Sequence, residues 1–308
     1  AYRSFTVLDE ALAYLDTCRA PVVVKADGLA AGKGVVVAAS LDEAREAVTA
    51  MLGAHRFGEA SKRVVIEDFL SGEEASFIVL CDGQCALPLA SSQDHKRVGD
   101  GDTGPNTGGM GAYSPAPVVT REVYERVMQE IIYPTIRGMA EDGIPYQGFL
   151  YAGLMIDKNG APRVVEFNCR FGDPETQVVL PLLESDLVDV MLSCIDGTLA
   201  DTEVKWSKGA AVCVVMAAGG YPKSYNKGDE ITGLKEAESG GNIVFHAGTS
   251  EKDGHVYTNG GRVLGVVAKA DGIKEAVDSA YASVEKIHFK DAHFRHDIAH
   301  WALERLKK

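Results

Sequence analysis

The sequence predicts a mixed α/β fold with more than one domain. Short β-branched runs alternate with longer amphipathic segments, hydrophobic residues make up 46% of the chain and charged residues 24%, and 308 residues exceed the usual size of one domain. This composition excludes disorder for the bulk of the chain. The net charge of −13 disfavours a nucleic-acid binder, and the longest apolar stretches are too short to cross a bilayer.

The first part of the chain alternates strand and helix signals. Val22–Val24 and Val35–Ala38 are β-branched runs on either side of a glycine-rich loop, and Val64–Ile66 is a third such run, so each predicts a strand. Ser40-Leu-Asp-Glu43 has the pattern of a capping box, in which the serine and the glutamate satisfy free N–H groups at a helix start. It therefore predicts a helix that reaches Leu52.

The middle of the chain carries one long polar segment between regular elements. Residues 91–117 are dense in Gly, Pro, Asp, Asn and Thr, which predicts a loop, and loops of that length are usually functional. A helix is expected over Thr120–Glu141, with a kink at Pro134 because proline cannot donate to the preceding turn. Lys158-Asn-Gly160 between two apolar runs predicts a hairpin.

A shift in composition near Trp206 marks an expected domain boundary. Beyond it, strand-like runs joined by Gly-rich turns precede two helical patterns at 273–287 and 295–306. We therefore expect two α/β subdomains over residues 1–70 and 71–206, followed by a smaller mixed α/β domain over residues 207–308.

The six cysteines are dispersed, without a CxxC pair or a metal-ligand spacing with histidine. They predict neither a disulfide framework nor a structural zinc site, and they favour a reducing, cytoplasmic compartment. The first residues carry no apolar leader segment, and the chain begins without Met.

A lysine-bearing loop is the first candidate site. Lys25 ends a buried strand, and Gly28, Gly32 and Gly34 surround a second lysine, Lys33. Ammonium groups and bare backbone N–H groups suit phosphate binding. The spacing matches neither a Walker A loop nor GxGxxG. The alternative is a hairpin turn with surface lysines.

Carboxylates at the end of two strands form the other candidate sites. Those between Glu67 and Glu74 could be solvated turn residues, or part of a hinge that binds a base and ribose hydroxyls. Glu166 and Asn168 share one strand face and offer the hard oxygen ligands that magnesium prefers. A half-buried strand with a polar face would explain Glu166 alone, but neither Asn168 nor the adjacent Arg170.

Together these sites resemble the ATP-grasp fold, and more closely the glycinamide ribonucleotide synthetase family. The resemblance extends over essentially the whole chain. It rests on six motifs in one order: Ala26-Asp-Gly-Leu-Ala-Ala-Gly-Lys-Gly34, Gln93-Asp-His-Lys-Arg97, Gly104-Pro-Asn-Thr-Gly-Gly-Met-Gly-Ala-Tyr113, Asn168-Cys-Arg-Phe-Gly-Asp-Pro-Glu175, Phe245-His-Ala-Gly-Thr249 and Thr258-Asn-Gly-Gly-Arg262.

The resemblance implies a fold and site roles. Residues 1–70 and 71–206 would be the small and large ATP-grasp subdomains, the larger with the metal site. Mg²⁺ or Mn²⁺ would bind Glu166 and Asn168, although the family's usual extra carboxylate is missing from Tyr151–Leu154. Catalysis would depend on charge stabilisation by Lys25, Lys33 and Arg170. ATP would bind through Lys25, Gly32, Lys33, the Glu67 carbonyl, the Leu70 amide and Glu74.

The remaining polar positions fit the other substrates. Arg170 would bind the glycine carboxylate or the acyl phosphate bidentately, and Arg262 the ribose phosphate. The alternative is a structural ion-pair network, which also occupies clefts. The full predicted set is Asp94, Lys96, Arg97, Thr107, Gly108, Gly109, Arg170, Asp173 and Arg262.

By resemblance, the activity is an ATP-dependent ligation. Glycine and 5-phosphoribosylamine would form glycinamide ribonucleotide through glycyl phosphate, the second step of de novo purine synthesis. The alternatives are an ATP-grasp ligase for another acid and amine, or a nucleotide-binding module without catalysis. The family carries a further N-terminal domain, which this chain is expected to lack and which would belong to a parent chain; no nucleic-acid or membrane partner is expected.

Overall fold

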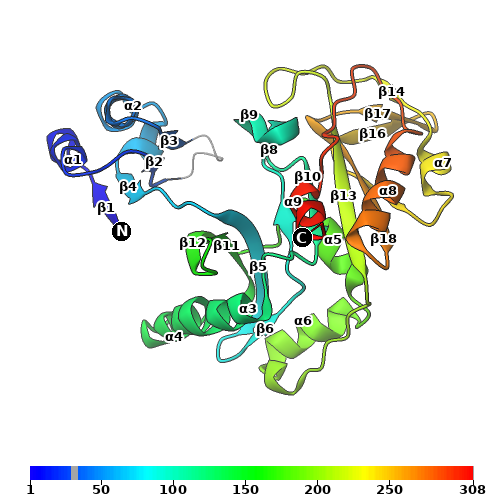
Figure 1. Ribbon diagram of the computed structural model, residues 1–308, viewed down its shortest axis with the longest axis horizontal. Coiled ribbons are helices and arrows are strands. Elements are labelled where there is room, and N and C mark those ends of the chain that lie inside the picture. Colours follow the sequence, from blue (N-terminus) through cyan, green and yellow to red (C-terminus); the bar gives the residue numbers. More distant parts are fainter. Residues whose placement is uncertain (29–33, 308) are drawn as a thin grey trace. The chain divides into compact units, whose positions relative to one another are not determined.

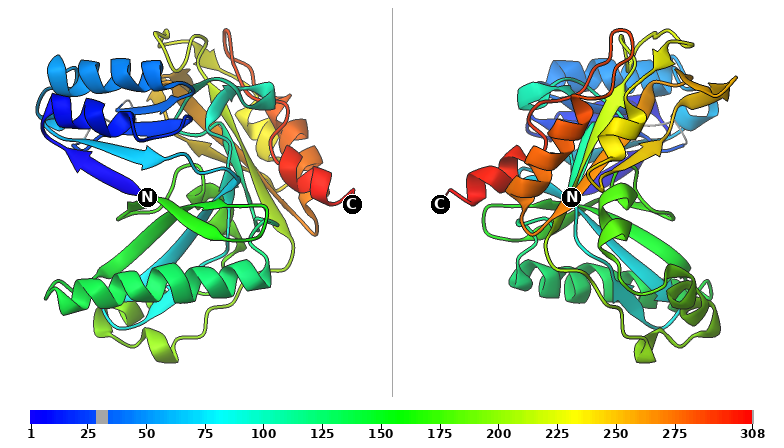
Figure 2. Two further views of the ribbon diagram at one scale, coloured as in Figure 1. Left: turned by 60° about the vertical axis from the view of Figure 1, so that its left-hand side comes forward. Right: turned by 90° about the vertical axis from the view of Figure 1, so that its right-hand side faces the viewer.

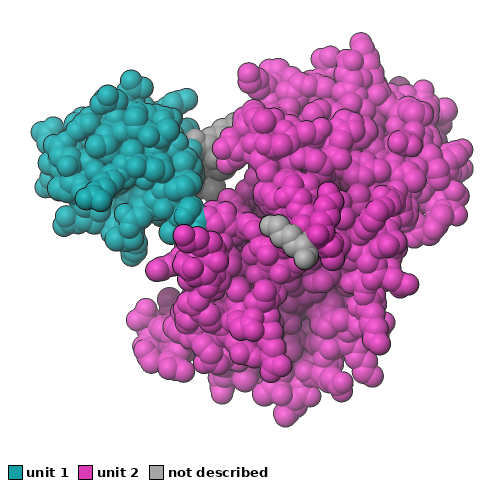
Figure 3. Space-filling view, viewed as in Figure 1, with its two compact units in different colours: residues 1–71 teal, residues 72–308 magenta. Residues whose placement is uncertain are grey.

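The computed structural model describes residues 1–28 and 34–307, which form several sheets covered by helices (Figure 1). The mixed α/β class predicted from the sequence is confirmed. Two compact units are present, Ala1–Ser71 and Gly72–Lys308, and each is described by itself (Figure 3). In the described part of the chain, no helix is long and apolar enough to span a membrane.

The first unit is an antiparallel sheet in the order β1-β4-β2-β3, with two helices packed against it. Alternate residues of the central strands, among them Val22, Val24, Val64 and Ile66, are buried against those helices. The elements are β1 (Tyr2–Phe5), α1 (Leu8–Leu15), β2 (Val22–Ala26), β3 (Val35–Ala38), α2 (Leu41–Val48) and β4 (Val64–Asp68).

The capping box forms and starts α2 as predicted. Ser40 Oγ accepts a hydrogen bond from the Glu43 N–H at 3.2 Å, and Glu43 Oε2 accepts one from the Ala39 N–H at 2.8 Å. A cap of this kind stabilises a helix by about 1 kcal/mol. The regular α-helix ends at Val48, and the chain reaches Gly53 through one wider π-type turn.

The second unit begins with a sheet in the order β12-β11-β5-β6. Phe77 and Val79 of β5 point to the face covered by α3 and α4, while Leu80 points to α6 on the other face (Figure 1). The elements are β5 (Glu73–Asp82), β6 (Ala86–Pro88), α3 (Arg121–Val127), α4 (Tyr133–Glu141), β11 (Gln147–Ile156), β12 (Pro162–Asn168), α5 (Thr176–Val179) and α6 (Leu187–Asp196).

The helix predicted over Thr120–Glu141 has its interruption before Pro134. A π-type turn over Met128–Ile132 separates α3 from α4, and Pro134 lies in the first turn of α4. Proline has no N–H to donate and its ring crowds the turn before it, so the hydrogen-bond pattern of the helix widens to a π-type turn there. The predicted hairpin at Lys158–Gly160 is confirmed, and Asp157 Oδ1 accepts the N–H groups of Asn159 and Ala161.

A second sheet of this unit has the order β15-β18-β13-β10-β7 and is covered by α8 (Figure 2). Beside it, β14, β17 and β16 form a small sheet. The elements are β7 (Gln93–Asp94), β8 (Arg97–Gly99), β9 (Thr103–Asn106), β10 (Gly111–Ser114), β13 (Ala210–Ala217), β14 (Glu230–Ile231), α7 (Leu234–Glu238), β15 (Ile243–His246), β16 (Thr249–Lys252), β17 (His255–Thr258), β18 (Arg262–Ala270), α8 (Ile273–Val284) and α9 (His300–Arg305).

Two sequence-based expectations are corrected here. Residues 91–117 are not one loop, because β7 and β10 lie in that segment and β10 pairs with β13. Tertiary pairing overrides the low strand propensity of Gly and Asp. The helix expected over residues 295–306 forms only as α9, because the side chains of Arg295 and Asp297 before it are bonded to residues 97–102.

Candidate functional site

Within the first unit, the predicted phosphate-binding lysine is held in an ion pair. Lys25 on β2 and Glu67 on the adjacent β4 lie 2.8 Å apart, Nζ to Oε2, and both are partly buried. Leu70 follows the end of β4. The structure thus brings Lys25 and Glu67 together. Gly32 and Lys33, predicted to complete the phosphate loop, lie outside the described residues.

Within the second unit, Glu166 and Asn168 share one face of β12, as the alternation predicted. Asn168 Nδ2 donates to Glu166 Oε1 at 3.2 Å, and Arg170 Nη2 lies 3.5 Å from Asn168 Oδ1. Gly153 of β11 pairs with Glu166, and a side chain there would crowd it: a Cβ would lie 3.3 Å from Glu166 Cγ. The missing side chain therefore leaves room for the glutamate.

The donor set of β12 fits a hard cation. A carboxylate and an amide oxygen are both hard ligands, and magnesium usually takes its remaining ligands from water and substrate phosphates. In the described residues, no group of three or more His, Cys, Asp and Glu side chains could hold a metal ion. A metal ion held by this pair of side chains would need its remaining ligands from elsewhere.

Lys96 lies at the centre of a group of carboxylates. Its Nζ contacts Glu74 Oε2 of β5 at 2.5 Å. Burial lowers the pKa of Lys96, but the negative charges of Asp94, Glu74 and Glu166 outweigh it, so the net shift is upward. Lys96 therefore stays charged, and three of the predicted site residues lie around it.

Asp94 is the buried carboxyl group of this site. It is 6% exposed, and burial, reinforced by the negative charges of Glu175 and Glu74 and opposed by Lys96, raises its pKa to about 7. Glu175 Oε1 accepts hydrogen bonds from Ser76 Oγ at 3.0 Å and from Tyr151 OH at 2.9 Å. Sequence reasoning gave Glu175 no role, although it stands inside the Asn168–Glu175 motif.

A second cluster joins the predicted glycine pair to Arg262. Arg262 Nη2 bonds Asp173 Oδ2 at 2.9 Å, and its Nη1 donates to the Gly108 carbonyl at 2.8 Å. At Gly109, with φ of +114°, an added Cβ would lie 2.4 Å from Pro174 Cδ, so only glycine fits. Thr107 Oγ1 donates to the Lys96 carbonyl at 2.9 Å, which links this cluster to the lysine group.

The two remaining predicted cations differ in their surroundings. Arg97 donates to the Gly104 carbonyl at 2.7 Å, across the hairpin of β8 and β9. Arg170 donates to the Phe171 carbonyl at 2.8 Å, and in the described part of the chain no carboxylate pairs with it. Its guanidinium is therefore available for an anionic ligand.

A buried network that sequence reasoning missed holds residues 95–102, the segment that follows β7. Arg295 is fully buried; its guanidinium makes two bonds to Asp297, both 2.7 Å, and one to Asp102 at 2.8 Å. His95 Nε2 accepts the Ala299 N–H at 2.9 Å, so the ring proton is on Nδ1, facing Asp102 at 3.9 Å. No motif signals Arg295, because one arginine in a polar stretch resembles a surface residue.

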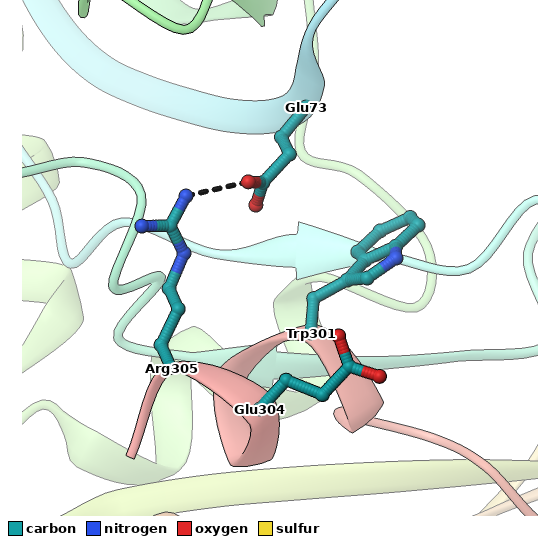
Figure 4. Close-up of a pocket in the computed structure, with 4 residues that line it drawn as sticks. All are labelled: Glu73, Trp301, Glu304 and Arg305. Carbon is teal, nitrogen blue, oxygen red and sulfur yellow. Dashed lines mark hydrogen bonds and ion pairs between the residues drawn. The ribbon is translucent and has the colours of Figure 1, made fainter. Parts of the chain in front are cut away.

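Two cavities lie in the second unit, and of the predicted site residues only Asp173 lines either of them among the described residues. One of about 270 Å³ lies between β5 and α9, where Arg305 bonds Glu73 at 2.5 Å beside Trp301 (Figure 4). Glu73 and Glu74 are successive strand residues, so they face opposite sides. The other, of about 530 Å³, is lined by Asp173, by residues of α5 and the turn after it, and by Phe245 and its neighbours on β15.

Comparison with family models matches both parts of the chain. Residues 1–176 match the family model described as phosphoribosylglycinamide synthetase, ATP-grasp (A) domain, and residues 211–301 match the C domain of the same synthetase. A phosphoribosylamine–glycine ligase of Vibrio vulnificus is 59% identical over 305 residues, which are 99% of this chain and 71% of that protein. One of Pseudomonas aeruginosa is 60% identical with the same coverage.

Comparison with solved structures gives the same family. A crystal structure of a phosphoribosylamine–glycine ligase from Thermotoga maritima matches with a TM-score of 0.87 and 38% identity, covering 97% of this chain and 74% of that one. A biotin carboxylase from Campylobacter jejuni, described as a complex with a β,γ-ATP ligand, matches with a TM-score of 0.67 and 14% identity over 93% of this chain and 62% of that one. This second likeness shows a shared fold alone.

Proposed function

Because the chain belongs to the phosphoribosylglycinamide synthetase family, we infer that it works as a phosphoribosylamine–glycine ligase, and we propose roles for its site residues. The family is shown by the model that matches residues 1–176 and by relatives close to 60% identical over 305 residues. The enzyme is an ATP-dependent ligase of purine biosynthesis with the ATP-grasp fold. The chain spans 71% of the length of those relatives.

The proposed reaction has two steps. The glycine carboxylate attacks the γ-phosphate of ATP and gives glycyl phosphate; the ribosylamine nitrogen then attacks the acyl carbon and displaces phosphate. Both steps depend on placing reactants and stabilising negative charge, for which the chain offers cations and backbone N–H groups. No residue of the chain needs to become covalently modified.

We assign nucleotide binding to residues of each unit. In the first unit, Lys25, Gly32 and Lys33 bind the phosphates, and the Glu67 carbonyl and Leu70 N–H bind the adenine edge. In the second, Glu74 binds ribose hydroxyls. The pairs Lys25–Glu67 and Lys96–Glu74 support these roles, because each holds a charged side chain in a fixed, partly buried position before ligand binds.

We assign a divalent metal, Mg²⁺ or Mn²⁺, to Glu166 and Asn168. A bound metal ion would neutralise charge on the phosphates. The chain's own part is to hold the two oxygen ligands on one strand face and to keep Arg170 beside them.

We assign the remaining residues to glycine and phosphoribosylamine. Arg170 binds the glycine carboxylate, because it has no carboxylate partner among the described residues. Arg262, which is bonded to Asp173 and to the Gly108 carbonyl, binds the ribose phosphate, and the Thr107–Gly109 turn beside it, with Asp173, belongs to the same substrate site. Asp94, Lys96 and Arg97 complete the phosphoribosylamine site.

The division into residues 1–70, 71–206 and 207–308, as small subdomain, large subdomain with the metal site, and C-terminal domain, is part of the same proposal. So is a cytoplasmic location, where purine synthesis takes place.

The observation that carries the assignment is Arg170 beside Asn168 and Glu166, in a chain that matches the family throughout. The test is ADP release by the purified chain with ATP and a divalent metal. We expect release to require both glycine and phosphoribosylamine. Release that is indifferent to glycine, or that is equally fast with another amino acid or amine, would show a ligase of different substrates; nucleotide binding without release under any pairing would show a non-catalytic module.

A further inference from the structure

A tyrosine that sequence reasoning did not single out contacts the substrate turn over Thr107–Gly109. Tyr221 lies in the turn that follows β13, and its hydroxyl accepts a hydrogen bond from the Gly108 N–H at 3.1 Å. The two residues are 113 positions apart in the chain, so the contact depends on the fold of the second unit. It joins the segment after β13 to a site that is otherwise built from other elements.

Gly108 is held on both sides of its Cα. Its N–H is bonded to Tyr221, and its carbonyl accepts from Arg262 Nη1 at 2.8 Å. A Cβ at Gly108 would lie 2.9 Å from Arg262 Cζ, so the guanidinium packs directly against the bare Cα. Glycine has more backbone freedom than any other residue, so the orientation of Gly108 depends on these partners. Tyr221 therefore holds the residue against which the Arg262 guanidinium packs.

The two neighbours of Gly108 are held by different partners. The Thr107 N–H donates to the Lys96 carbonyl at 2.7 Å, and the Gly109 N–H donates to Thr107 Oγ1 at 3.0 Å. Neither bond involves Tyr221. Loss of the Tyr221 hydroxyl should therefore release Gly108 and leave the rest of the turn in place.

The Tyr221 ring is itself held in a defined position. A Cβ at Gly261, the residue before Arg262, would lie 2.4 Å from Tyr221 Cδ2, so the ring lies against that glycine. The ring of Tyr225 lies 6.3 Å away, centroid to centroid. The Tyr221 N–H donates to the Ala218 carbonyl at 3.1 Å, which fixes the backbone. The hydroxyl is thus presented to Gly108 by a side chain that is packed and a backbone that is bonded.

We infer that Tyr221 is a positioning residue for the ribose phosphate, an inference that rests on the function proposed above. Its hydroxyl acts through Gly108 and keeps the Arg262 guanidinium in the orientation that binds the phosphate. Since Tyr221 acts on the binding of one substrate and not on the reacting atoms, its loss should weaken the affinity for phosphoribosylamine. The affinities for ATP and glycine should stay as they are.

The test is a comparison of Michaelis constants. Tyr221→Phe keeps the ring and removes the hydroxyl. Glycine-dependent ADP release is measured with phosphoribosylamine formed in the assay from ribose 5-phosphate and ammonia. We expect the KM for phosphoribosylamine to rise about 3–10-fold, the effect of one lost hydrogen bond. We expect kcat and the KM values for ATP and glycine to stay within about twofold.

The matched control removes the same atom from another tyrosine of the second unit. In Tyr124→Phe, the hydroxyl is lost from an exposed side chain on α3. No kinetic constant should change in this variant. Urea denaturation of both variants should give free energies of unfolding close to that of the unsubstituted chain, which separates positioning from a general loss of structure.

A double-mutant cycle tests the route through Arg262. Arg262→Lys removes the planar fork that contacts Gly108. If Tyr221 acts through that guanidinium, adding Tyr221→Phe to Arg262→Lys should raise the KM for phosphoribosylamine by less than about twofold further. The same rise in both backgrounds would show that the two residues act independently, and it would overturn the inference.

The remaining outcomes are distinct. An unchanged KM for phosphoribosylamine in Tyr221→Phe, or equal rises in the KM for all three substrates, would also overturn the role of Tyr221. Absence of ADP release from the unsubstituted chain with glycine and phosphoribosylamine would instead refute the proposed function itself, and the inference with it.

Discussion

Asp94 and His95 are neighbours in the chain at the end of β7, yet they face two regions of opposite character. Asp94 faces the group around Lys96, where carboxylates outnumber cations. His95 faces the network of Asp102, Arg295 and Asp297, where a fully buried guanidinium is bonded to both aspartates.

The pKa shifts of the two regions run in opposite directions. His95, followed by Arg295, lowers the pKa of Asp102 to about 2, whereas burial among other carboxylates raises the pKa of Asp94 to about 7. The difference reflects both burial, which is deeper at Asp94, and the sign of the charges that surround each carboxyl group. In the region around Arg295 each charged side chain has a partner of opposite charge, and the region stabilises the fold. In the region around Lys96 the carboxylates outnumber the cations, and one carboxyl group there has a raised pKa.

Removing Arg295 should have the largest effect. Arg295→Met removes a fully buried guanidinium and leaves the half-buried Asp102 and Asp297 without their cation, so we expect the free energy of unfolding to fall by about 3 kcal/mol. Urea denaturation measures it. In the control, Arg121→Met, an exposed i,i+4 pair with Glu125 is lost, and the change should stay below about 0.5 kcal/mol. Similar losses of unfolding free energy for both variants would show that the buried ion pairs of Arg295 stabilise the fold no more than an exposed pair.

Arg170 tests the opposite case, a cation without a carboxylate partner. Arg170→Met should leave stability within about 0.5 kcal/mol, because no buried charge is left unpaired. The kcat/KM for glycine should fall about 10²-fold, since a charge-assisted bond to the carboxylate is lost. Kinetics at varied glycine, with thermal unfolding in parallel, check both. A stability loss as large as that of Arg295→Met would make Arg170 structural.

Asp102→Asn should have a pH-dependent cost. Because the folded pKa of Asp102 lies below its unfolded value near 4, its stabilisation is present above pH 4 and is lost as pH falls toward 2. We expect the variant to be less stable by about 1–2 kcal/mol at pH 7, a figure reduced for partial exposure. The difference should be clearly smaller in unfolding measured near pH 2.5, where Asp102 begins to take up a proton in the folded state as well; a constant difference would contradict the shift.

Asp94→Asn should change stability in the opposite sense, by the smallest amount. The folded pKa of Asp94 is raised, so ionising it costs the folded state stability as pH rises from about 4 through about 7. The amide cannot ionise, so the variant should gain about 1 kcal/mol relative to the unsubstituted chain between pH 5 and pH 8. Unfolding curves at these two pH values measure it, and a relative loss at pH 8 would contradict the raised pKa.

Features that depend on nearby residues could be predicted from the sequence. The capping box at Ser40, the hairpin at Lys158–Gly160 and the shared face of Glu166 and Asn168 all follow from spacings of two to four residues. The family resemblance added the polar positions around Lys96 and Arg262.

Features that depend on residues far apart in the chain could not be predicted from the sequence. Lys25 and Lys96 each pair with a carboxylate on another strand, and β7 and β10 are strands because of partners far along the chain. Arg295 is buried only because residues 97–102 close over it. Local spacing carries no information about such pairings.

The pairing of β10 with β13 also has a consequence for how the protein is made. Ala112 lies opposite Cys213, so the two partners are separated by about a hundred residues of chain. A ribosome adding roughly 5–20 residues per second leaves β10 waiting several seconds for its partner. During that time β10 has an unpaired edge, the kind of surface on which nascent chains associate wrongly. Release of residues 210–217 from the ribosomal tunnel therefore sets the earliest moment at which this sheet can close.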